Sequence, residues 1–223
     1  MKKILLAAAA ALMTIGAYAQ YRPTFIVSAG YQGASLKVEN NSDTQLASGA
    51  RVGVDADFSV IDAGAVNFSI RPGVHFSMKG SKYANGLDLG SLGSFSGSVT
   101  DHLYYLDVPV LANVGFNAGG FGVYVNAGPY VGFGVGSSRT TVTSTETVIT
   151  DPKTNVDSNS TNLFAEDGGI YKPFDWGFQL GAGVEFNRFL VGVGTQFGLG
   201  NISRFDNVSV KNSDFFVTVG YRF

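Results

Sequence analysis

The residues that could do chemistry are few in this chain, and most of them alternate with apolar residues. Only 14% of the 223 residues are charged, and the only histidines are His75 and His102. There is no cysteine, which excludes thiolate catalysis and Cys-ligated metal sites. The remaining chemistry is ion pairing or, at His75, acid–base catalysis. The titratable side chains in the alternating pattern are Asp55, Asp57, Arg71, His75, Lys79, Asp107, Asp175, Glu185 and Arg222.

Catalysis would have to depend on His75. A hydrolase needs a nucleophile and a base within hydrogen-bond reach, and His75 could contact Asp107, with Ser77 nearby in sequence. His102 has the parity of the outward-facing residues and lies at the extracellular end of its strand. An interfacial, non-catalytic position is therefore favoured for it. No G-x-S-x-G, H-E-x-x-H or phosphate-loop motif occurs. We therefore predict that the protein is not an enzyme and has no cofactor or metal. A lipid-modifying enzyme is the alternative.

The N-terminus and the charge balance indicate an exported protein. Lys2 and Lys3 precede an uncharged run that ends at Ile15, and Ala17 and Ala19 form an A-x-A cleavage motif. We expect residues 1–19 to be a signal peptide and residues 20–223 to form the mature protein. The chain has 15 Lys and Arg against 17 Asp and Glu, so there is no excess of positive charge and no nucleic-acid partner is expected.

The charged residues must be positioned by strands, because apolar residues recur at every second position. The even positions of the segment 174–187 are wholly apolar, and the odd positions are Gly, Gln, Asn, Asp or Glu. These runs are longer than the five or six residues typical of soluble strands. A tilted strand that crosses a bilayer needs about 9 to 11 residues with apolar-out and polar-in alternation.

Eight strands with this pattern can be placed. They are expected over residues 24–38, 49–60, 65–83, 99–116, 121–138, 173–187, 189–203 and 213–223. Tight connections at 61–64, 117–120 and 187–188 alternate with longer ones, which is the pattern of short periplasmic turns and long external loops. The predicted fold is all-β: an eight-stranded antiparallel transmembrane up-and-down β-barrel in the bacterial outer membrane, with both termini periplasmic.

Hairpin registers predict which side chains meet in the lumen, because a tight turn must place apolar residues of both strands on one side. If Val60 faces Val66, Asp55 lies opposite Arg71. In the third hairpin, Phe116 would face Phe121. Eight-stranded barrels have interiors filled by side chains and buried charges need partners, so a structural plug is favoured over a porin. The predicted lumen ionic network comprises Asp55, Asp57, Arg71, His75, Asp107, Glu185 and Arg222.

Several motifs together resemble a family of outer-membrane barrels. These are Tyr105-Leu-Asp-Val-Pro-Val-Leu111, Ala127-Gly-Pro-Tyr-Val-Gly-Phe133, the stretch from Phe174 to Gly183, and the terminal Gly-Tyr-Arg-Phe. Their order through the mature chain is similar to that of the outer-membrane β-barrel domain family often called PorT-like. The resemblance implies an eight-stranded barrel in a Gram-negative outer membrane. It also implies that Tyr221 and Phe223 form a C-terminal signal read by the barrel-assembly machinery. The named member of that family serves a protein-secretion system.

The longest predicted loop runs from Arg139 to Lys172. Half of the residues from 137 to 162 are Ser or Thr, a composition that cannot bury a core of its own. The loop is either a solvated connection, with strands extending beyond the bilayer through Thr140 to Thr150, or a binding site for an extracellular ligand or secretion partner. We predict a monomer surrounded by outer-membrane lipid with a structural or surface-recognition role. An accessory role in a secretion system is a further alternative.

Overall fold

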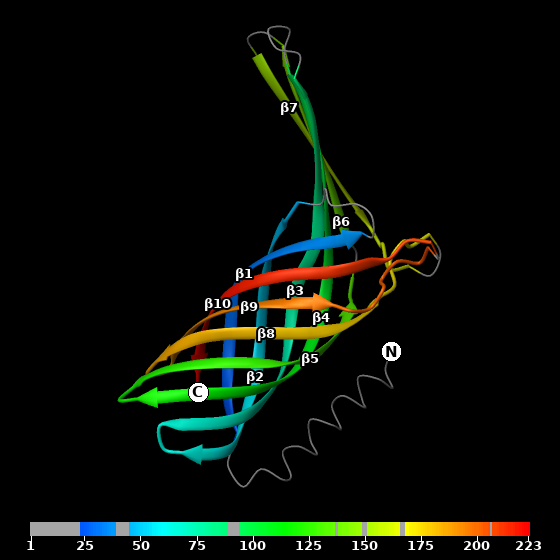
Figure 1. The fold of residues 1–223 in the computed structure, drawn as a ribbon. Coiled ribbons are helices and arrows are strands. Elements are labelled where there is room, and N and C mark those ends of the chain that lie inside the picture. The colour runs from blue at the N-terminus through cyan, green and yellow to red at the C-terminus, as the bar shows by residue number, and fades with distance from the viewer. Residues whose placement is uncertain are drawn as a thin grey trace.

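The computed structural model describes residues 23–38, 45–88, 94–136, 138–148, 151–165, 168–205 and 207–223. The predicted signal peptide lies outside the described residues. Ten strands and no helix occur within these ranges (Figure 1). The strands are β1 (Thr24–Val38), β2 (Ala47–Ala63), β3 (Val66–Asp88), β4 (Ser94–Ala118), β5 (Phe121–Gly134), β6 (Ser138–Val148), β7 (Asp151–Thr161), β8 (Phe174–Phe186), β9 (Phe189–Gly198) and β10 (Val210–Arg222).

Eight of the ten strands close into an antiparallel barrel, as predicted from the sequence. The wall runs β1-β2-β3-β4-β5-β8-β9-β10, and β10 returns to pair with β1 from Ile26–Arg222 to Val38–Val210. Closure leaves no edge strand within this wall, which is what hydrocarbon surroundings require. Among the described residues no helix has the length and apolar character needed to cross a membrane.

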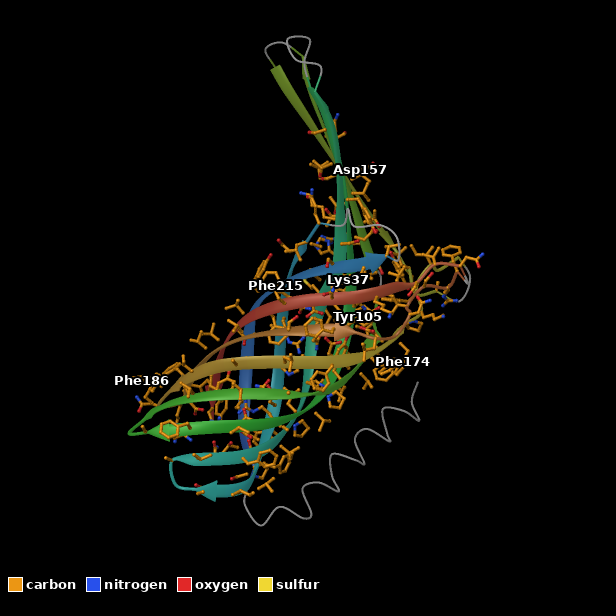
Figure 2. The ribbon with its side chains drawn as sticks, in the orientation of Figure 1. Lys37, Tyr105, Asp157, Phe174, Phe186 and Phe215 are labelled. Atoms are coloured by element: carbon orange, nitrogen blue, oxygen red, sulfur yellow. The ribbon has the colours of Figure 1, made fainter. Side chains whose placement is uncertain are left out.

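The barrel carries apolar side chains on its outer face and polar side chains inside. On β8 the side chains of Trp176 and Phe178 are exposed, whereas those of Asp175 and Gln179 are buried. Most of the wall has the same arrangement, although apolar side chains such as Leu111 and Phe216 are also buried inside. In Figure 2 Phe174, Phe186 and Phe215 lie along the outside. Lipid can solvate the apolar face, and ion pairs can satisfy the polar one.

Two strands arise inside the segment that was predicted to be a loop. β6 pairs with the upper part of β4, from Ser94–Thr147 to His102–Arg139, and β7 pairs with β6 along its whole length. β5 ends at Gly134 and leaves the edge of upper β4 free for β6. Upper β3, upper β4, β6 and β7 thus form a four-stranded sheet that projects from the barrel (Figure 1). We call it the arm.

Two predicted registers are wrong near the turns. In the β2–β3 hairpin Ala63 rather than Val60 faces Val66, which is a shift of three residues. A bulge between Ser59 and Ile61 reduces the shift to two residues, so Asp55 lies opposite Gly73. In the β4–β5 hairpin Phe121 faces Ala118 rather than Phe116. Both turns are tighter than expected, because glycines with positive φ close them with two residues: Gly64 in the first, Gly119 and Gly120 in the second.

Candidate functional site

The lumen near the tight turns holds a connected set of ion pairs, which we call the turn-end network. Arg71 Nη2 lies 2.9 Å from Asp57 Oδ2, and Arg222 Nη1 lies 2.8 Å from the same oxygen. Arg222 also donates two hydrogen bonds to Glu185, at 2.7 and 2.9 Å. β2, β3, β8 and β10 therefore each contribute one member. The predicted pairing of Asp55 with Arg71 is wrong, because the β2–β3 register brings Asp57 to Arg71 instead.

Asp55 pairs with the histidine in the middle of the barrel. His75 Nε2 lies 2.9 Å from Asp55 Oδ1, and both side chains are buried. His75 also faces Asp107 across the β3–β4 ladder, as anticipated, but the carboxylate of Asp107 binds other partners. The hydroxyl of Ser77 accepts a hydrogen bond from Arg51 at 2.9 Å. His75 is therefore bonded to Asp55, whereas Ser77 and Asp107, its possible catalytic partners, are both bonded to Arg51.

A second, fully buried cluster lies nearer the loops. We call Arg51, Lys79, Asp107, Asp175 and Asp214 the upper cluster. Lys79 Nζ lies 3.0 Å from Asp107, 3.5 Å from Asp175 and 3.8 Å from Asp214. The Arg51 guanidinium lies 3.3 Å from Asp107. The ammonium thus stands where three carboxylates converge. In the part of the chain that the structure describes, no group of three or more His, Asp or Glu residues is placed to hold a metal ion.

Aromatic rings complete the surroundings of these two cations. Lys79 Nζ lies 4.6 Å from the ring centre of Tyr130 and 5.0 Å from that of Tyr105, and the Arg51 guanidinium lies 4.5 Å from that of Phe216. Such cation–π contacts favour a charge that has left water. Lys79 and Asp175 belong to the alternating pattern of titratable residues in the sequence, whereas Arg51 and Asp214 were not predicted. The parity that placed Asp55 and Asp57 inside also places Arg51 inside, and Asp214 has the same parity as Arg222.

An apolar lid packs over the upper cluster at the loop end of the barrel. It comprises Leu36, Leu103, Tyr105, Phe164, Tyr171, Ile202 and Val210. Tyr105 meets Phe164 edge to face at 5.4 Å, and Figure 2 places Tyr105 within the barrel. Arg204 donates hydrogen bonds to the backbone carbonyls of Tyr171 and Phe164 and holds the two loops together. Burial raises the pKa of the Tyr171 phenol, which stays neutral in the lid.

The open space in the lumen lies toward the tight turns. A polar cavity of about 300 Å³ is bordered by the turn-end network and by Asn67, Ser69 and Asn113. A cavity of about 60 Å³ follows it in mid-barrel, beside Asp55, His75 and Arg51. The lumen therefore narrows from a polar vestibule to the upper cluster and ends under the lid. This arrangement supports the predicted structural plug rather than a diffusion channel.

The model of a family described as outer membrane protein beta-barrel domain matches residues 18–204. The chain belongs to this family. As an outer-membrane barrel it lies in lipid, in accord with its apolar outer face. The narrower PorT-like resemblance remains a prediction, and so does the assembly signal at Tyr221 and Phe223, whose rings meet edge to face at 5.0 Å.

No curated protein matches the sequence. Among solved structures, the attachment invasion locus protein Ail of Yersinia pestis, in complex with the heparin analogue sucrose octasulfate, is 14% identical; the alignment covers 91% of this chain and 100% of that one, with a TM-score of 0.37. The outer membrane enzyme PagL is 12% identical over 88% and 98% of the two chains, with a TM-score of 0.47. Neisserial surface protein A is 12% identical over 89% and 97%, with a TM-score of 0.36.

Proposed function

We propose that this outer-membrane barrel is a monomeric surface-recognition protein whose arm binds an extended segment of a partner protein. One observation carries the proposal: within the described residues, β7 pairs with β6 alone and forms the free outer edge of the arm. A free edge presents unpaired backbone N–H and C=O groups. Extended peptides add to such edges as a further strand. Val156 of β7 is 65% exposed and can supply an apolar contact beside the backbone bonds.

The proposal requires the arm to face the outside of the cell and the tight turns to face the periplasm. The two-residue turns and the C-terminal strand end lie at one end of the barrel, and the arm and the lid loops lie at the other. Short periplasmic turns and long external loops are the usual arrangement in outer-membrane barrels. Both termini would then be periplasmic, where the barrel-assembly machinery could read Tyr221 and Phe223.

Single cysteines test this orientation cleanly, because the chain has none of its own. Asn155 in β7 and Arg188 in the β8–β9 turn are both exposed, so Asn155→Cys and Arg188→Cys form a matched pair. A maleimide reagent too large to cross the outer membrane should label Asn155→Cys on intact cells. It should label Arg188→Cys only after the membrane is opened. Labelling of Arg188→Cys on intact cells, with Asn155→Cys protected, would reverse the orientation.

The recognition role is tested in a deletion strain complemented with chosen variants. In one variant a short Gly-Ser linker replaces residues 138–161, and in a second, Val156→Asp places a charge on the free edge, which hinders strand addition. We expect adhesion to protein-coated surfaces to fall to the level of the deletion strain in the first variant and partway in the second. Secreted protein and envelope lipid should stay unchanged.

The same strain separates the two alternative functions. An accessory of a secretion system would lose secreted protein rather than adhesion. If the protein is a lipid-modifying enzyme, its deletion would alter the envelope lipid, and complementation with His75→Ala would not restore the wild-type lipid. Either result, with adhesion intact, would contradict surface recognition. The hydrogen bonds of His75 and Ser77 do not favour the enzyme: Ser77 accepts a bond from Arg51, His75 Nε2 is bonded to Asp55, and His75 Nδ1 has no hydrogen-bond partner among the described residues.

A further inference from the structure

Three prolines lie in adjacent strands of the closed wall: Pro72 in β3, Pro109 in β4 and Pro129 in β5. Proline has no N–H to donate to a ladder, so it is normally confined to edge strands and bulges. In hydrocarbon no water replaces the missing bond. The ladders are interrupted beside these prolines. The β2–β3 pairing stops at Asp55–Gly73 and resumes at Phe58–Ile70, and the β3–β4 pairing stops at Pro72–Val110 and resumes at His75–Asp107.

A groove lies on the outer face where the β2–β3 ladder is interrupted. Its volume is about 210 Å³. Its lining combines small residues with two phenylalanines. Phe58 is only 8% exposed although it lies on the membrane-facing side, whereas Phe25 on the neighbouring strand is 50% exposed. No charged or hydroxyl side chain lines the groove. The lining residues are Phe25, Val54, Ala56, Phe58, Pro72, Gly73 and Val74.

The wall behind this groove is thin, and buried ion pairs lie directly on its inner side. A methyl group on Gly73 would collide with the carboxylate of Asp55 and the imidazole of His75, so only backbone separates the groove from that pair. The Asp57–Arg71 ion pair, at 2.9 Å, spans the two strands inside the barrel where the backbone pairing is missing. Side chains therefore hold β2 and β3 together at the level of the groove.

The groove lies at the depth of the acyl chains. Pro72 follows Val66, the first residue after the turn, by six positions, or about 20 Å along the strand. At a tilt of roughly 40° this is about 15 Å along the membrane normal, well inside an apolar band about 25 Å tall. A peptide at this depth would bring backbone groups that lipid cannot satisfy. Hydrocarbon can fill an apolar groove there without such a cost.

We propose that this groove is a specific binding site for one acyl chain of a phospholipid, distinct from the lipid that covers the rest of the wall. Specificity arises because a chain in the groove contacts lining residues of both β2 and β3 and the ring of Phe25, whereas a chain on the flat wall meets one surface. The proposal is independent of the arm and of surface recognition, so failure of either leaves the other standing.

Photo-crosslinking tests the site on the full mature chain. The protein is placed in nanodiscs of phosphatidylethanolamine, a small fraction of which carries a diazirine midway along one acyl chain, and the labelled residues are mapped by mass spectrometry. We expect residues 54–58 and 72–74 to be labelled at least roughly fivefold more than the far wall around Ala182, the ratio that about 1 kcal/mol of preference gives. Even labelling around the barrel would overturn the proposal.

Two matched variants control for the side chain introduced. Ala56→Phe fills the groove, and Ala182→Phe places the same side chain on the outer face of β8 between Val125 and Val193. Labelling at the groove should fall to the level of the far wall in Ala56→Phe and stay unchanged in Ala182→Phe. If Ala56→Phe does not fold, as judged by mobility of unheated samples on gels, Ala56→Leu replaces it. Persistent labelling in a folded groove-filling variant would contradict the site.

Parallel samples distinguish the phospholipid from the other possible occupants of the groove. A free fatty acid with the same diazirine, in nanodiscs of unlabelled lipid, should label the groove less than the phospholipid does. If it labels the groove and the phospholipid does not, the site belongs to fatty acids and the proposal is wrong. A second copy of the chain would appear as a dimer that Ala56→Phe dissociates, and that result would also overturn it.

Discussion

Replacing Lys79 with Met should lower the free energy of unfolding by about 3 to 5 kcal/mol, the cost of stranding a buried charge without its partner. The Lys79 ammonium is wholly buried and has carboxylates of Asp107, Asp175 and Asp214 within 4 Å. Met keeps the apolar stem but removes the positive charge, which leaves Arg51 as the one cation paired with this cluster among the described residues. Urea unfolding in detergent at neutral pH measures the difference.

Two controls make the Lys79 result specific to buried charge. Lys37, on β1, is exposed (labelled in Figure 2), so Lys37→Met should leave stability unchanged within error. Asp214→Asn in the Lys79→Met background should recover part of the loss, because it removes one of the stranded charges. The deficit should also shrink as the pH falls, since protons neutralise the remaining carboxylates. A loss below about 1 kcal/mol would mean that the cluster is hydrated and pays no burial cost.

Most of the barrel could be predicted because every second residue of a wall strand faces lipid and must be apolar. The strand predicted over 24–38 coincides with β1, and the remaining seven wall strands differ at their ends. Asp57, Arg71 and His75, which share the inward parity, are buried. What parity cannot determine is the register, because a shift of two residues leaves every side chain on the same face. The two-residue shift at the β2–β3 hairpin therefore changed the partner of Arg71 without changing the fold.

The lid and β7 were not predicted, for a different reason, whereas β6 lies where strands through Thr140 to Thr150 were the alternative. Phe164 and Tyr171 come from a connection whose apolar residues follow neither a strand nor a helix period. Ile202 was expected in the strand over 189–203, but β9 ends at Gly198. β6 and β7 have the Ser and Thr content of a solvated loop. Their strands form because upper β4 extends beyond β5 and offers β6 a free edge. Such a long-range pairing partner is not visible in local composition.

The corrected register predicts which carboxylate couples energetically to Arg71. Asp57 Oδ2 lies 2.9 Å from the Arg71 guanidinium, and both side chains are 5% exposed. Asp57→Ala leaves Arg71 without its carboxylate partner and Arg222 with Glu185 alone, so it should cost about 3 to 5 kcal/mol. Arg71→Ala should cost less, because Arg222 still neutralises Asp57 at 2.8 Å.

A double-mutant cycle turns this difference into a test of the register. The cycle of Asp57→Ala with Arg71→Ala should give a coupling of about 1 to 3 kcal/mol, the range for residues that share an ion-pair network. The matched cycle of Asp55→Ala with Arg71→Ala should give a coupling near zero, since Asp55 is bonded to His75 at 2.9 Å. Both cycles are read from urea unfolding in detergent. If Asp55 couples to Arg71 and Asp57 does not, Val60 faces Val66, and the bulge between Ser59 and Ile61 is absent from the folded protein.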